Sequence, residues 1–63
     1  MIIDGQKVKV GDVVGFKSDI EQYGVVEKID GDWLHLYSED GFAGDYLRYA
    51  KRTVEHKDRC WID

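Results

Sequence analysis

The sequence predicts an all-β protein in which residues 1–63 form one small barrel of five strands. Short segments rich in β-branched and aromatic residues alternate with glycine turns, which is typical of strands joined by hairpins. The 63 residues also have room for only one core. Five short strands fit a small barrel better than a sandwich, which needs more strands.

Three strands are predicted in the first half of the chain, over residues 12–17, 23–29 and 33–37. The polar segment 18–22 is interpreted as a loop. Asp30-Gly31 is typical of a tight hairpin, because glycine accepts the positive φ that such a turn needs.

The second half of the chain has a less regular pattern. Residues 45–52 fit either a short helix with Asp45 as N-cap or a fourth strand. We expect a strand or an irregular segment there, with one short helical turn at most. A last strand near residues 59–62 completes the count of five.

The apolar residues of these strands predict the core. Val26 and Ile29 are three apart, so both can face the core only if a bulge or a sharp bend lies between them. Gly24 removes a side chain where two strands come close. The predicted core contains Val14, Phe16, Val26, Ile29, Leu34 and Leu36, with Val10 and Leu47 beside it.

A spaced pattern covers residues 10–36 and consists of Gly11-Asp12-x-Val14-x-Phe16, Gly24-x-Val26-x-x-Ile29-Asp30-Gly31 and Leu34-x-Leu36. It resembles the KOW motif of SH3-like barrels in ribosomal proteins and transcription elongation factors, and the opening of small Tudor-like proteins. The resemblance implies an SH3-like barrel that works close to nucleic acid. The loop at 17–22 tends to be basic in nucleic-acid-binding KOW proteins but is acidic here, which argues against RNA contact by this loop.

The cysteine, histidine and hydropathy content limits the class of protein. Cys60 is the only cysteine, so no intramolecular disulfide can form, and two histidines beside it are too few for structural zinc. We expect no metal and no cofactor. No membrane span or signal peptide is recognisable, which predicts a soluble, cytoplasmic protein.

The charge is distributed unevenly. The net charge is −4, but residues 1–47 carry ten acidic and four basic residues, whereas residues 48–59 carry five basic and two acidic ones. The acidic residues of the body could imitate a phosphate backbone or bind a basic partner. The simpler interpretation is that they form turns and a solvated surface.

Trp33, His35 and Tyr37 are the first candidate binding site, because period two places them on the face opposite Leu34 and Leu36. Exposed aromatic residues can stack on bases, hold a cation or anchor a peptide. The alternative is that twisting half-buries both faces of the sheet and Trp33 packs on the C-terminal segment.

The second candidate is the basic, aromatic stretch that contains Tyr46, Arg48, Tyr49, Lys51, Arg52, His56, Lys57 and Arg59. Cations interleaved with rings suit single-stranded nucleic acid, since the charges meet phosphates and the rings stack on bases. The alternative is that these cations pair with carboxylates of the same molecule.

The sequence therefore predicts a non-enzymatic binding or regulatory protein. No phosphate loop or nucleophile motif is present, and His56 and Cys60 would meet only on a helix. The expected partner is nucleic acid or a nucleic-acid machine such as a polymerase or ribosome. The alternative is a protein-interaction module, for example a phage or mobile-element protein that binds a host protein. A third possibility is self-association through an open barrel edge.

Overall fold

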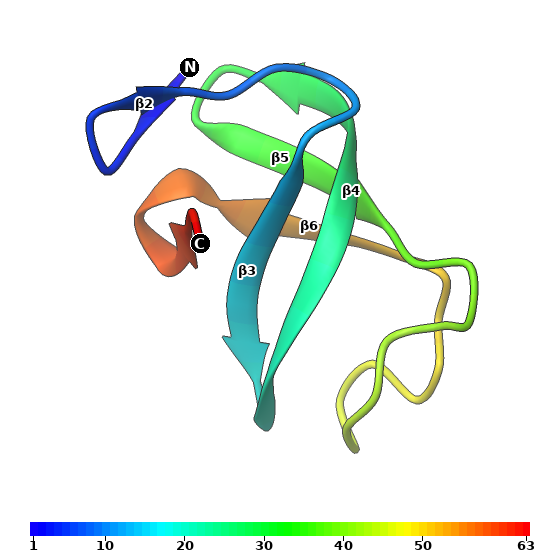
Figure 1. Ribbon diagram of the computed structural model, residues 1–63. Helices are drawn as coiled ribbons and strands as arrows, with labels where there is room; N and C mark the ends of the chain where they lie inside the picture. Colours follow the sequence, from blue (N-terminus) through cyan, green and yellow to red (C-terminus); the bar gives the residue numbers. More distant parts are fainter.

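Strands joined by tight turns make up most of the molecule, which confirms the all-β prediction. The computed structural model describes residues 1–63 (Figure 1). A two-stranded hairpin comes first, followed by a five-stranded sheet and one 3-10 helix. The hairpin contains β1 (Ile2–Ile3) and β2 (Gln6–Lys7), and the sheet contains β3 (Val13–Ser18), β4 (Ile20–Asp30), β5 (Trp33–Tyr37), β6 (Arg52–His56) and β7 (Cys60–Trp61), with η1 (Lys57–Arg59) before β7. No helix is long and apolar enough to cross a bilayer.

The five-stranded sheet is antiparallel throughout, with strand order β6-β5-β4-β3-β7. Its two edge strands, β6 and β7, are neighbours in the sequence and are separated only by the three residues of η1. The sheet must therefore curl until its edges come close, and Figure 1 shows β6 crossing behind β3 and β4. Because β6 and β7 do not pair, the five-stranded sheet is open and is not a closed barrel, whereas the sequence predicted a small barrel with a closed or nearly closed sheet.

The predicted loop at 18–22 is wrong. The chain reverses at Asp19, which has φ 64°, and Ser18 pairs directly with Ile20. Pairing continues through Lys17 with Glu21 and Phe16 with Gln22. The polar composition of this segment reflects exposed positions on two paired strands rather than a loop.

The predicted bulge is confirmed. The register between β4 and β5 shifts between Val26 and Lys28, so Val26 pairs with Leu36 while Ile29 pairs with Leu34. The extra residue, Glu27, allows both apolar side chains to face the interior.

Residues 38–51 form a long loop between β5 and β6, and the fourth strand begins only at Arg52. No helix forms over residues 45–52. Arg48 N–H donates to the Gly44 carbonyl and Ala50 N–H donates to the Leu47 carbonyl, which produces two successive turns. Arg48 and Tyr49 then adopt positive φ values of 51° and 63°, which stop helical propagation. The one helical turn is η1.

The core agrees with five of the predicted residues, since Val14, Phe16, Val26, Leu34 and Leu36 are fully buried. Ile29 and Leu47 are half-buried and pack against it. Val10 is 58% exposed, so its prediction was wrong. The sequence argument missed four buried residues, Ile3, Val8, Phe42 and Cys60.

Phe42 joins the long loop to the core. Its ring meets Phe16 edge-to-face at 5.3 Å between centroids. A Cβ on Gly24 would lie 2.9 Å from Phe42 Cζ and 3.0 Å from Leu36 Cβ. Gly24 is thus required by packing against a loop residue and β5, in addition to the strand approach that the sequence suggested.

Phe42→Ala should destabilise the protein by about 3–5 kcal/mol, because it removes a large buried ring and leaves a cavity. In a domain of this size that is most of the free energy of unfolding. Urea denaturation measures the change. Tyr46→Ala, an exposed aromatic residue of the same loop, is the control and should change stability by less than about 0.5 kcal/mol. Equal effects of the two substitutions would contradict the placement of Phe42.

Candidate binding surface

Trp33, His35 and Tyr37 lie on the outer face of β5, as the sequence predicted. Register places them opposite His56, Val54 and Arg52 of β6. Trp33 remains 49% exposed, although its ring meets the His56 imidazole edge-on at 5.0 Å. His35 and Tyr37 are half-buried. The predicted strip and its alternative are therefore each partly correct, because Trp33 packs on β6 but keeps half its surface in solvent.

Arg52 makes its contacts within the same molecule, although its side chain remains 68% exposed. Its Nε donates to Glu27 Oε1 at 3.0 Å, and its guanidinium carbon lies 4.9 Å from the centre of the Tyr37 ring. The Glu27 carboxylate comes from the bulge of β4. This ion pair and cation–π contact cover Tyr37 and reduce what either residue can offer to a ligand.

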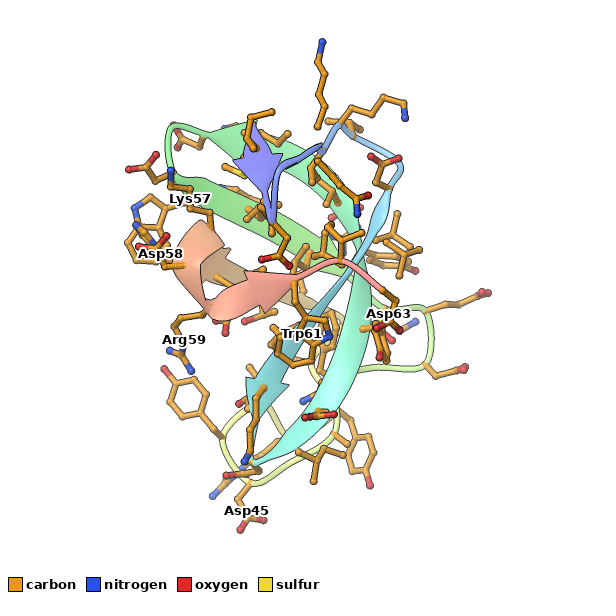
Figure 2. All side chains as sticks on the ribbon, turned by 60° about the vertical axis from the view of Figure 1, so that its left-hand side comes forward. Asp45, Lys57, Asp58, Arg59, Trp61 and Asp63 are labelled. Atoms are coloured by element: carbon orange, nitrogen blue, oxygen red, sulfur yellow. The ribbon has the colours of Figure 1, made fainter.

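The cations around η1 also face carboxylates of the same chain. Lys57 Nζ lies 3.8 Å from Asp32 Oδ1, and Arg59 Nη2 lies 4.0 Å from Glu55 Oε1. His56 Nδ1 accepts a hydrogen bond from the Asp58 N–H at 3.1 Å, which caps η1. Figure 2 shows Lys57, Asp58 and Arg59 together on this one turn, away from Trp61, which lies over β3. For these residues the structure shows the alternative stated above, in which the cations pair with carboxylates of the same molecule.

Four predicted site residues in the long loop, unlike those described above, are exposed and make no ion pair. Tyr46 and Tyr49 are 84% and 72% exposed. Arg48 and Lys51 are exposed and make no ion pair; the Arg48 Nε donates only to the Asp45 carbonyl, at 3.0 Å. We call residues 44–51 the tyrosine loop. It is the one part of the basic stretch in which rings and unpaired cations remain together in solvent.

The tyrosine loop is anchored to the tip of the β3–β4 hairpin. The Gln22 amide donates to the Ala43 carbonyl at 3.0 Å and accepts from the Ala43 N–H at 2.9 Å. The Asp45 N–H donates to Asp19 Oδ2 at 2.6 Å. Together with buried Phe42, these bonds attach the start of the loop to the hairpin and the core. Figure 2 shows Asp45 at the extremity of the molecule, at the outer end of this anchor.

A groove of about 620 Å³ runs beside β6. One wall is formed by residues 53–56 of β6, and the opposite side by residues 17–19 and Tyr46, with Arg59 and Trp33 also lining it. This is the opening that remains because the sheet does not close. No sequence pattern identified it, since it depends on how the two edges of the sheet meet.

Glu55 lies in this groove, and its Oε1 is the one buried side-chain polar atom without a hydrogen bond. Its side chain is 13% exposed, and Oε1 has no hydrogen-bond partner. Burial raises the pKa of Glu55, and the positive charge of Arg59 opposes this only in part. A buried carboxylate oxygen without a donor is costly, so this position favours a hydrogen-bonding group from outside.

Cys60 and His56 do not form a nucleophile–base pair. The Cys60 thiol points to the His56 backbone carbonyl at 3.5 Å, while the His56 imidazole caps η1. Burial raises the pKa of Cys60 to about 11, so the thiol is protonated at neutral pH. The pair is not arranged for nucleophilic catalysis.

A second exposed apolar area lies on the outer faces of β3 and β4 and was not predicted. Val13, Tyr23 and Val25 are exposed there. Tyr23 faces Gly15, and the Trp61 ring occupies the space where a Gly15 side chain would be. A hydrogen bond to Asp63 raises the pKa of the Tyr23 hydroxyl. Period-two alternation in residues 23 and 25 was a signal that could have found this area.

No protein-family model matches the chain, and no curated protein or solved structure matches it either.

Glu55→Gln should raise the melting temperature at pH 7. A carboxyl whose pKa is raised by folding contributes stability below its unfolded pKa and loses it as the pH rises through the folded pKa. The neutral amide removes this penalty, so the difference from the natural chain should shrink as the pH falls to about 4. Thermal denaturation between pH 4 and 8 measures it. The exposed Glu21→Gln is the charge-matched control and should show no such trend; a pH-independent difference for Glu55→Gln would refute the burial argument.

Proposed function

We propose that this chain is a non-enzymatic binding module of the SH3-like barrel type that docks on nucleic acid or on a nucleic-acid machine such as a polymerase or ribosome. Two features support the SH3-like assignment. The strands β3 to β6 form an antiparallel meander, and a single 3-10 turn returns the chain so that β7 pairs with β3. The KOW-like pattern of residues 10–36 covers the first part of this meander.

The nucleic-acid proposal rests on the exposed rings and unpaired cations of the tyrosine loop. Tyr46 and Tyr49 present two open rings, and Arg48 and Lys51 present charges that no carboxylate of the chain neutralises. Bases stack on such rings, and phosphates pair with such cations. Because Gln22 and Asp19 already fix the start of the loop, binding would cost less conformational entropy.

The acidic residues outside the tyrosine loop limit the side from which nucleic acid could approach. Outside the tyrosine loop the chain has 12 acidic and 7 basic residues, so its net charge there is −5 and disfavours contact with a polyanion, whereas the loop has two basic residues and one acidic residue. Nucleic acid would therefore approach end-on, from the side where Asp45 stands in Figure 2. A machine with an exposed nucleic-acid segment meets the same requirement.

Arg48→Glu and Lys51→Glu should each weaken binding to a single-stranded oligonucleotide about tenfold or more at low salt and lower the salt slope by about 0.7 per lost phosphate contact. Fluorescence anisotropy over a salt series measures both quantities. Lys7→Glu makes the same charge change on β2 and serves as the control, with a much smaller effect expected. The absence of binding to single- and double-stranded oligonucleotides at low salt would rule out direct nucleic-acid recognition.

A protein-interaction module is the second candidate, and the outer face of the sheet favours it. Trp33 and Val54 are exposed on β5 and β6, and Val13, Tyr23 and Val25 are exposed on β3 and β4. These are two exposed apolar areas, and such areas commonly mark protein contacts. A phage or mobile-element protein that binds a host protein would fit this chemistry.

If this second candidate is correct, Trp33→Ala should weaken capture of the partner from nuclease-treated lysate of the native host at least tenfold, since aromatic anchors dominate such interfaces. Quantitative pull-down measures the loss. Ile2→Ala removes an apolar side chain that is 59% exposed, against 49% for Trp33, from the separate β1–β2 hairpin and should leave capture unchanged. Partners that disappear on nuclease treatment would favour the nucleic-acid proposal instead.

A further inference from the structure

One edge of β6 carries backbone groups that the sheet does not use. β6 is a terminal strand of the sheet and pairs only with β5. The Ser38 N–H donates to the Lys51 carbonyl, and the Lys57 N–H donates to the Asp32 carbonyl. Hydrogen-bonded and non-hydrogen-bonded pairs alternate along an antiparallel ladder, and these two bonds show which pairs are which. Thr53 and Glu55 therefore direct their backbone groups to β5. The N–H and carbonyl of Val54, between them, point away from the sheet.

The groove lies along this same edge. Residues 53–56 form one of its walls, and the β3–β4 tip and Tyr46 face them across the opening. Arg59 Nη2 donates to the Lys17 carbonyl at 3.3 Å, which connects η1 to β3 across the groove. An extended chain laid in the groove would therefore meet the unpaired groups of Val54 directly.

Glu55 indicates which kind of side chain the bound segment would carry. Added strand pairing through Val54 makes Glu55 a non-hydrogen-bonded position of the new pair, where opposite side chains come closest. The charged groups near it are Arg59, at 4.0 Å, His56, Lys17 at the far wall, and Asp19, whose carboxylate accepts from the Asp45 N–H. Glu55 Oε1 still lacks a donor. A Lys or Arg side chain opposite Glu55 would supply it.

We propose that the free edge of β6 binds an extended segment of a partner protein as a sixth strand, with a Lys or Arg of that segment opposite Glu55. Tyr46 of the tyrosine loop borders this site, but the backbone groups and the carboxylate that would bind the segment belong to β6, so the proposal does not depend on the nucleic-acid contact. The backbone bonds give affinity, and the carboxylate selects the basic residue.

The test uses the full chain and a displayed library of random heptapeptides as the probe. Selected peptides are titrated into ¹⁵N-labelled protein. We expect recovered peptides to carry Lys or Arg, and to shift the amide signals of Val54 and His56 while slowing hydrogen exchange at Val54. Replacing that basic residue by norleucine should weaken binding about tenfold, and in Glu55→Gln the same replacement should change binding less than about twofold.

Val54→Pro removes the outward N–H without removing a ladder bond to β5, so the sheet should persist while peptide binding falls at least tenfold. Arg48→Glu, in the tyrosine loop, should leave peptide binding unchanged, which separates this proposal from the nucleic-acid one. The proposal is overturned if no peptide is enriched, if bound peptides shift signals elsewhere, or if Glu55→Gln keeps the preference for a basic residue. A concentration-dependent dimer or an oligonucleotide that protects the Val54 amide would also overturn it.

Discussion

The three residues of η1 join the two opposite edges of one sheet, and the rest of the architecture depends on that short connection. Because β6 and β7 cannot separate by more than η1 allows, the sheet curls around Phe16, Leu34 and Leu36 and buries one face. The same connection stops short of closing the sheet. It leaves the groove beside β6 and places Glu55 where neither solvent nor a neighbouring strand satisfies it.

The long loop shows how a surface feature can be stabilised by a small core. Phe42 enters the interior against Phe16, and the Gln22 amide holds the Ala43 backbone on both sides. A loop of this length would ordinarily lose its order in solvent. Here its exposed rings stand on a fixed base, so recognition by the loop and the stability of the fold share the same few contacts.

Local signals predicted the parts of this fold that local physics determines. The Val26 to Ile29 spacing indicated the bulge, and Asp30-Gly31 indicated the hairpin, because both depend on neighbouring residues alone. The reversal at Asp19 was missed because composition suggested a loop. The polar partners Gln22 and Ala43 are 21 positions apart, and no sequence period reports such a bond. The candidate rings and cations were visible in the sequence, but which of them are paired depends on the register of β5 with β6.

The free edge of β6 also affects how the chain behaves at high concentration. An unpaired strand is a template for edge-to-edge aggregation, and this one carries an exposed Val54 at its centre. Arg52 and His56 flank that valine on the same face and can act as gatekeepers that oppose stacking of identical chains. The curl of the sheet also protects this edge, because it keeps β6 beside the β3–β4 tip. A cut or local unfolding near η1 would relax the curl and expose the edge. The state of the molecule most prone to aggregation is therefore one in which the sheet is intact but flat.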